Sequence, residues 1–478
     1  MARNRRILTL SGRTGPLAAV TAAALAAGAL TLWTPVAAAA PCDPWPPAGA
    51  GAGAGVGSGS LGGSMGGGAA TPATPWANGD SGYIPVLRGR TTTVQLLTGP
   101  TSPNKTVDRF GISGTDLGIL WDNGNVAKPE VMMALGDTMG DCSKPDDEWR
   151  SNILFRSSDR TLADGMRIDS APMESPGMAK SILPRTGHRD ETTVIPTAGV
   201  EVGGTQYLRY MSVERWGLPG EWTTNYSALA RSTDNGENWA PVRDTARRGT
   251  APMPLPVNLG KQYTRHTDGQ MSAFVKHAVG GVDYVYEYLT PSGRSGSARL
   301  ARVPAAQIED MGAYRFWDGT DWVPDQSNAV PVLGAPTINT TVSELSVSWS
   351  ERLGRFIAIY NNRDNNIVMS QALSPEGPWS GEDILLSYQH VPTLYGAYVH
   401  PWSPAVQANG KDLFFTMSTW DAYNVFLMKT DLTTIAARTS PDPNARMRAT
   451  DDSWTRNTPD PADTGETVLV ERRPIPAS

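Results

Sequence analysis

Cysteine and histidine are scarce in this sequence. Only 2 cysteines and 5 histidines occur among the 478 residues. Two thiols cannot build a disulfide framework or a four-ligand zinc site, and the histidines are scattered without metal-ligand spacing. We therefore expect no cofactor and no catalytic metal.

An excess of positive charge and a phosphate-binding motif are also lacking. The 41 Lys and Arg residues are balanced by 47 Asp and Glu residues, for a net charge of −6, which argues against nucleic acid as a partner. No glycine-rich phosphate loop follows a strand-like segment, so nucleotide chemistry is set aside. The 49 Gly, 38 Pro, 15 Trp and 14 Tyr residues, against 8 Phe, favour strands and turns over a helical bundle.

The two ends of the chain have compositions unlike a folded domain. Residues 1–40 combine arginines, an apolar Ala/Leu run and a small-residue cleavage site, as a signal peptide does. An uncleaved anchor is the alternative. Residues 41–80 are a Gly/Ala/Pro-rich linker and residues 436–478 a polar tail, both expected to be disordered. We therefore expect a protein that is secreted or held in the cell envelope, with no membrane contact after cleavage. The sequence leaves open whether Cys42 and Cys142 pair.

The stretch between the ends contains an internal repeat. A short apolar strand preceded by another apolar strand recurs five times, about 55 to 75 residues apart, at residues 151–156, 226–232, 297–302, 366–370 and 423–428. Repeated antiparallel units without an intervening helix pattern are typical of blades around an axis. The sequence predicts an all-β protein, a five-bladed β-propeller over residues 81–435. A double-sheet sandwich is the alternative.

Two carboxylates stand inside apolar strands that we expect at the axis. Asp116 lies between Gly114 and Gly118, and Asp137 ends an apolar run in Gly-Asp-Thr. A charge in such a strand is costly unless it has partners or a function. The turn at residues 122–124 would join the strands as a hairpin and bring the two acids to one mouth. We interpret them as catalytic acids; the alternative is that they cap turns.

A glycosidase set has room for a third acid. Glu344 lies in an alternating strand that would place it with Ser346 and Ser348 on one face. Asp268, in a turn-like segment, is its rival. Either residue completes the set.

Polar and aromatic side chains of the kind that bind sugars occur at strand ends. The candidates for substrate binding are Trp121, Arg294, Tyr395, His400, Trp420 and Asn424. Core packing or turn capping is the alternative for each of them. No metal ligand set is expected, although a propeller axis leaves room for a structural calcium ion.

Seven short motifs, in their order along the chain, resemble a known family. They are Gly114-Thr-Asp-Leu-Gly118, Gly136-Asp-Thr138, Pro291-Ser-Gly-Arg294, Leu300-Ala-Arg-Val-Pro304, Glu344-Leu-Ser346, Tyr395-Gly396 and Tyr423-Asn-Val425. The family comprises secreted actinobacterial proteins, long described as a domain of unknown function and since linked to endo-D-arabinanases of the mycobacterial cell wall. The resemblance, over roughly residues 86–432, implies a five-bladed propeller glycoside hydrolase whose early acids correspond to Asp116 and Asp137.

The function expected from the sequence is therefore a secreted endo-D-arabinanase that uses carboxylate acid/base catalysis. Its partner would be a neutral cell-wall polysaccharide, the arabinan of arabinogalactan or lipoarabinomannan, which a mildly acidic protein does not repel. A non-catalytic, lectin-like propeller is the main alternative. A sialidase-like hydrolase is less favoured, because an anionic sugar calls for an arginine cluster.

Overall fold

The computed structural model describes residues 82–437, apart from 142, 219, 252–253, 265–267 and 335–340, and residues 467–475. The expected signal peptide, the linker and both cysteines lie outside these ranges.

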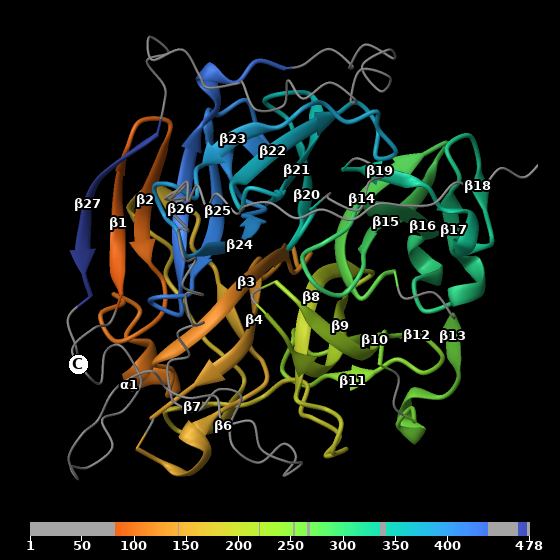
Figure 1. Ribbon diagram of the computed structural model, residues 1–478, viewed down its shortest axis with the longest axis horizontal. Helices are drawn as coiled ribbons and strands as arrows, with labels where there is room; N and C mark the ends of the chain where they lie inside the picture. The colour runs from red at the N-terminus through yellow and green to blue at the C-terminus, as the bar shows by residue number, and fades with distance from the viewer. Residues whose placement is uncertain are drawn as a thin grey trace, which may run out of the picture. The chain divides into compact units, whose positions relative to one another are not determined.

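Five sheets, antiparallel except for one outer strand pair in the second blade, surround one axis (Figure 1). Their innermost strands contact one another in a closed ring, in which β3 contacts β8, β8 contacts β14, β14 contacts β20, β20 contacts β24, and β24 contacts β3. These inner strands are β3 (Gly114–Asp122), β8 (Thr193–Val202), β14 (Met271–Val279), β20 (Ser346–Ser350) and β24 (Leu394–Val399). The predicted five-bladed propeller is confirmed.

Each blade continues outward from its inner strand. The first blade adds β4 (Val131–Met139) and β5 (Ile153–Ser157). The second adds β9 (Thr205–Trp216), β10 (Trp222–Ser232), β11 (Ala240–Pro241), β12 (Ala246–Arg248) and β13 (Gln262–Thr264). The third adds β15 (Val282–Thr290), β16 (Ala298–Pro304), β17 (Arg315–Trp317), β18 (Trp322–Val323) and β19 (Pro331–Leu333). The fourth adds β21 (Arg355–Asn361), β22 (Ile367–Ala372) and β23 (Asp383–Leu386).

The fifth blade closes the ring with strands from both ends of the domain. It consists of β24, β25 (Asp412–Thr419), β26 (Asn424–Asp431) and, as its outer strand, β2 (Thr91–Leu96) from the beginning of the domain. The five repeats read from the sequence correspond to β5, β10, β16, β22 and β26, the third strand of each blade. Each copy of the repeat therefore marks the same strand position, the third, in its blade.

Glycine pairs form the turns at the ends of two inner strands. Gly203 and Gly204 join β8 to β9, and Gly280 and Gly281 join β14 to β15; all four have positive φ. A two-residue hairpin turn with positive φ at both positions matches the twist of the strands that it joins, and glycine adopts it without steric cost. These turns fix the register of the two hairpins.

Two further strand pairs lie outside the blades. Strand β1 (Tyr83–Arg88) pairs with β27 (Val468–Pro474), so part of the segment expected to be a polar tail adds a strand beside the beginning of the domain. Strands β6 (Met173–Ser175) and β7 (Met178–Ala179) form a small hairpin.

Helices are short throughout the described ranges, and none has the length and apolarity needed to cross a membrane. They are α1 (Thr106–Phe110), α2 (Pro404–Gln407) and the 3₁₀ turns η1 (Pro145–Glu148), η2 (Leu162–Asp164), η3 (Val257–Leu259), η4 (Ala305–Gln307), η5 (Met311–Ala313), η6 (Gln326–Asn328) and η7 (Leu432–Thr434).

A buried ion cluster joins the second and third blades. Glu287 of β15 accepts hydrogen bonds from Arg247 of β12 at 2.7 Å and from Arg209 of β9 at 3.0 Å, and all three side chains are fully buried. Burial raises the pKa of Glu287, but the two guanidinium groups outweigh this effect and hold it at about 2. Glu287 therefore holds two blades together.

Candidate active site

The beginnings of the inner strands meet at one mouth of the channel. Asp116 is the third residue of β3, Thr193 begins β8, Glu344 precedes β20 by two residues and Tyr395 is the second residue of β24. Tyr395 contacts Asp116, and Thr193 contacts Asp137 of β4. The charge of Glu344 acts on Asp116, and that of Asp116 acts on Asp137. Asp116, Asp137 and Glu344, three of the four acids singled out in the sequence, are thus brought together.

A bulge in β3 aims Asp116 at this mouth. The pairing of β3 with β4 shifts register on both sides of Leu117, and Leu117 and Gly118 have φ values of 70° and 85°. Positive φ is rare for a residue with a branched side chain, and strain of this kind is kept where it serves a function. Bulges re-aim side chains in the same way. The small residues around Asp116 in the sequence therefore serve its placement.

One oxygen of Asp116 is held and the other is free. The Tyr395 hydroxyl donates to Oδ2 at 3.0 Å, whereas Oδ1 is buried and has no hydrogen-bond partner among the described residues. Burial, with the negative charge of Glu344, raises the pKa of Asp116 to about 7, although the Tyr395 hydrogen bond and Arg294 oppose the increase. A buried, unpaired carboxyl oxygen costs free energy, so a ligand is its expected partner.

Asp137 is held in a similar way from the other side. Thr193 donates to its Oδ1 at 2.6 Å, and the indole of Trp149 donates to the same atom at 3.1 Å. Burial and the neighbouring charge of Asp116 raise its pKa well above the usual value, against the effects of these hydrogen bonds and of Arg185. Both hydrogen bonds fall on Oδ1, and no residue in the described ranges donates to Oδ2, which leaves Oδ2 as the oxygen for a ligand.

Arg294 and Tyr395 connect Glu344 to Asp116. Arg294 Nε donates to Glu344 at 2.9 Å, and Ser343 donates to the same carboxylate. The Arg294 guanidinium lies 5.1 Å from the ring centre of Tyr395 and 5.5 Å from that of Trp420. The two rings stack at 4.1 Å. This stack fixes the ring whose hydroxyl group donates to Asp116, so we interpret Glu344, Arg294 and Trp420 as positioning residues as well as candidate sugar contacts.

The glycine before Asp137 makes room for Asp116. A Cβ atom on Gly136 would lie 2.4 Å from Asp116 Oδ1, a separation that no real Cβ atom shows. We expect Gly136→Ala to displace the Asp116 carboxylate and to lower kcat by at least tenfold on any substrate of this site, since small misplacements of a reacting group are costly.

Gly381→Ala is the matched control, because a Cβ atom there has no neighbour within 4 Å. Equal kcat values for the two variants and the wild type would contradict this reading of Gly136.

Four of the candidate residues from the sequence form ion pairs, hydrogen bonds or packing contacts that do not involve the three acids. Asp268 forms an ion pair with Arg299 of β16, and none of its recorded contacts reaches the three acids. His400 is fully buried beside Trp402, and burial lowers its pKa to about 3. These contacts favour the structural alternatives for both residues.

Trp121 and Asn424 are also engaged in packing. The indole of Trp121 donates to Gln206 at 2.9 Å, and the ring fills the space over Gly199 of the next blade. Asn424 accepts from Thr98 and donates to the Ser113 carbonyl, both within 3.1 Å. Trp121 therefore packs at the interface between two blades, and the Asn424 amide forms hydrogen bonds that hold the backbone and side chains around it.

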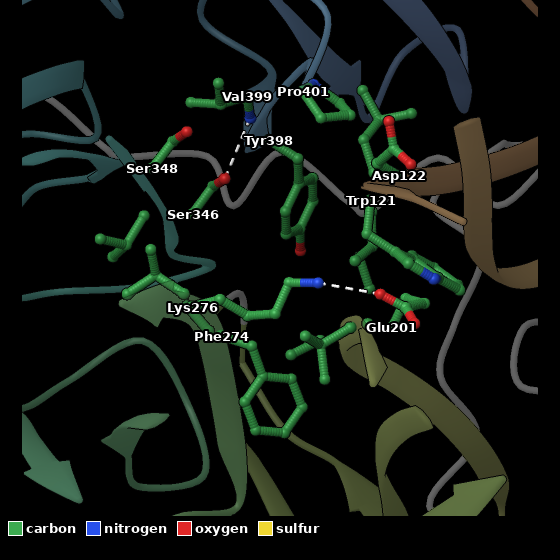
Figure 2. Close-up of a pocket in the computed structure, with 18 of the residues that line it drawn as sticks. Trp121, Asp122, Glu201, Phe274, Lys276, Ser346, Ser348, Tyr398, Val399 and Pro401 are labelled. Atoms are coloured by element: carbon green, nitrogen blue, oxygen red, sulfur yellow. Dashed lines mark hydrogen bonds and ion pairs between the residues drawn. The ribbon is translucent and has the colours of Figure 1, made fainter. Parts of the chain in front are cut away.

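A cavity of about 290 Å³ lies further along the channel, lined by residues of all five inner strands. Figure 2 shows Tyr398 extending into it and Lys276 reaching Glu201, at 2.9 Å. The charges of Glu344 and Asp116 act on the Tyr398 hydroxyl, so Tyr398 lies between this cavity and the acids. None of the three clustered acids lines the cavity itself.

Several residues of the site escaped the sequence reasoning. Thr193 and Trp149 hold Asp137, Arg185 stacks over Trp149 at 4.8 Å, and Tyr398 borders the acids. Thr193 is a polar residue at the start of an apolar strand, and a polar residue within an apolar strand was the signal that identified Asp116. No comparable signal marks Trp149. In the described part of the chain, no group of three or more His, Cys, Asp or Glu side chains is arranged to hold a metal ion; the structural calcium ion stays a prediction.

Known proteins resemble this chain over most of the propeller. "Notoamide biosynthesis cluster protein J" of Aspergillus sp. (strain MF297-2) is 27% identical over 332 residues, which are 65% of this chain and 81% of that protein. The arabinanase of Bacillus subtilis superimposes with a TM-score of 0.38 at 12% identity, covering 66% of this chain and 96% of its own. An exo-beta-1,3-galactanase of Phanerochaete chrysosporium gives 0.40 at 10% identity, covering 73% and 66%. Structural similarities of this size carry no argument about function.

A family model matches most of the propeller domain. It runs over residues 101–429, from just before α1 to within β26, and so includes Asp116, Asp137 and Glu344. The chain belongs to the family described as "Domain of unknown function (DUF4185)".

Proposed function

We propose that this protein is a glycoside hydrolase, an endo-D-arabinanase that cleaves the D-arabinan of cell-wall arabinogalactan or lipoarabinomannan. The observation that carries the proposal is the pair Asp116 and Asp137. Both carboxyls are buried at one mouth, both have raised pKa values, and each has one oxygen without a recorded hydrogen bond. Two carboxyl groups of different acidity are what hydrolysis of a glycosidic bond requires.

The order of ionisation assigns the roles. Asp116 has a pKa of about 7, and its negative charge raises the pKa of Asp137 further. In the proposed mechanism Asp116 is the carboxylate and Asp137 the carboxylic acid, since ionisation of one carboxyl of a coupled pair keeps the other protonated to higher pH. Asp137 donates its proton to the leaving glycosidic oxygen as the C–O bond breaks. Asp116 takes a proton from the attacking water, so that one bond is hydrolysed and the pair returns to its starting state after proton exchange with solvent.

The charges at the mouth support a neutral sugar as the substrate. The guanidinium of Arg294 is neutralised by Glu344 and its face lies over aromatic rings. It is therefore not a free cation for an anionic sugar, whereas the stacked rings and carboxylates suit neutral sugar hydroxyls. This favours a neutral arabinan over a sialic acid substrate. The resemblance to proteins linked to endo-D-arabinanases selects arabinan among neutral polymers.

The site of action proposed is outside the cytoplasm, in the cell envelope or the medium. It rests on the signal-peptide pattern of residues 1–40, and it agrees with a cell-wall polysaccharide as partner.

A panel of neutral polysaccharides tests the proposal. The purified chain is incubated with mycobacterial arabinogalactan, plant L-arabinan, β-1,3-galactan and xylan, and the soluble products are separated by chromatography. We expect D-arabino-oligosaccharides of several lengths from arabinogalactan alone. Products from another polymer would keep the hydrolase and reject the substrate, and no products from any polymer would favour the lectin-like alternative.

The ionisation of the pair predicts a pH profile. We expect kcat/KM on arabinan to rise about tenfold per pH unit below pH 7, because Asp116 must lose its proton, whose pKa is about 7. At higher pH, the rate should fall as Asp137 ionises. Initial rates between pH 4 and pH 10 check this expectation, and maximal activity at pH 4 to 5 would contradict the assigned roles.

A further inference from the structure

The tip of the β9–β10 hairpin presents an aromatic pair. Trp216 ends β9 and Trp222 begins β10 directly opposite it, and their rings meet edge to face at 5.6 Å. Both rings are partly exposed, and Leu218 between them is 68% exposed. No step of the proposed hydrolysis uses these residues.

The hairpin tip touches the active site through Arg294. The backbone N–H of Arg294 donates to the Gly220 carbonyl at 2.7 Å, and a Cβ atom on Gly220 would lie 3.5 Å from the Arg294 side chain. Trp216 and Trp222 also pack against the same apolar cluster as Leu117, Tyr395 and Trp420. The hairpin tip that carries the aromatic pair therefore lies against Arg294, the partner of Glu344.

We propose that Trp216, Trp222 and Leu218 form a binding subsite for a neutral sugar unit of the polysaccharide, remote from the bond that is cleaved. The inference rests on the proposed function and deepens it. Apolar ring faces bind the C–H faces of sugars, and such a platform holds a chain without taking part in bond cleavage. Its position beside Arg294 places it along the path of a polymer whose reacting unit lies at Asp116 and Asp137.

The test compares long and short substrates. A platform away from the reacting bond contributes to the binding of a polymer but not of a short arabinofuranoside that fills only the reacting subsite. We expect Trp222→Ala and Leu218→Asp to raise the KM for arabinogalactan about tenfold, with kcat and the rate on the short substrate unchanged. Trp222→Tyr, which keeps an aromatic face, should restore most of the binding.

Matched controls exist in other blades. Trp317 and Trp322 form a similar pair, 5.3 Å apart, on the outer strands β17 and β18, and Leu373, which follows β22, is 58% exposed. Trp322→Ala and Leu373→Asp should leave KM unchanged. Leu218 has little packing to lose, so Leu218→Asp gives a result even where Trp222→Ala impairs folding.

Retardation of the protein in gels containing soluble arabinogalactan separates this inference from the proposed function. Hydrolysis with unchanged KM and retardation in the Trp222 and Leu218 variants would overturn the platform alone. Retardation of the wild type without hydrolysis, lost in these variants, would support the platform and overturn the hydrolase. A wild type that neither hydrolyses nor is retarded would overturn both. A platform that binds a protein partner would leave retardation unchanged in the variants.

Discussion

Asp116→Asn and Asp137→Asn are each expected to lower kcat on arabinan by about 10² to 10⁴-fold, the usual contribution of a positioned acid or base. Asparagine fills the same space but can neither take the proton nor donate the proton that the proposed mechanism assigns to Asp116 and to Asp137. Asp122→Asn on the same strand is the control, because Asp122 caps its turn at Gly124 and lies at the far end of β3. A loss of less than tenfold in either variant would contradict the assigned roles.

The raised pKa of Asp116 also predicts how Asp116→Asn changes the unfolding temperature at different pH values. A carboxyl whose pKa is raised on folding keeps its proton in the folded state over a pH range where the unfolded chain has lost it, so stability falls as pH rises through that range. For Asp116, the range runs from its ordinary value of 3.8 to about 7 and corresponds to roughly 4 kcal/mol. Asp116→Asn should therefore unfold at a higher temperature than the wild type at pH 8, and this difference should shrink at pH 4.

Glu287→Gln is expected to have the largest effect on stability, with a loss of about 3 to 5 kcal/mol in the free energy of unfolding. The neutral side chain would leave Arg209 and Arg247 as two buried cations without a counter-charge between the second and third blades. Glu309→Gln is the matched control, because its ion pair with Arg231 is partly exposed, with 34% of the Glu309 side chain accessible to solvent, and should contribute less than about 1 kcal/mol.

Denaturant unfolding at pH 7 measures both losses. Similar midpoints for the two variants would show that the buried cluster does not hold the blades together. The cluster takes no part in the proposed chemistry, so Glu287→Gln should retain the kcat of the wild type at temperatures where it stays folded.

The architecture was predictable because it repeats. The third strand of every blade has the same apolar pattern, and five copies indicate five blades. Asp116 and Asp137 were identifiable because a carboxylate within an apolar strand needs an explanation. The strand β27 was not, since its pairing with β1 joins segments almost 400 residues apart, and only a short apolar stretch marks it.

The partners of each acid depend on contacts between blades, which no local pattern reports. For the third acid, the sequence favoured Glu344 and left Asp268 as its rival. Their surroundings differ, because Glu344 pairs with Arg294, whose guanidinium lies over the Tyr395 ring, whereas Asp268 pairs with Arg299. His400 resembled a sugar ligand in its local sequence, but the strands around it bury the imidazole completely. Local sequence thus indicated the residue types, and the closure of the ring determines which of these side chains lie together.

One measurement tests the central claim most directly. The wild-type chain, Asp116→Asn and Asp137→Asn are incubated with mycobacterial arabinogalactan under identical conditions, and released oligosaccharides and bound protein are measured in the same samples. The account predicts arabino-oligosaccharides from the wild type, almost none from either variant, and retention of all three proteins on the polysaccharide. Equal product release by the wild type and both variants, or retention of the wild type without any product, would contradict it.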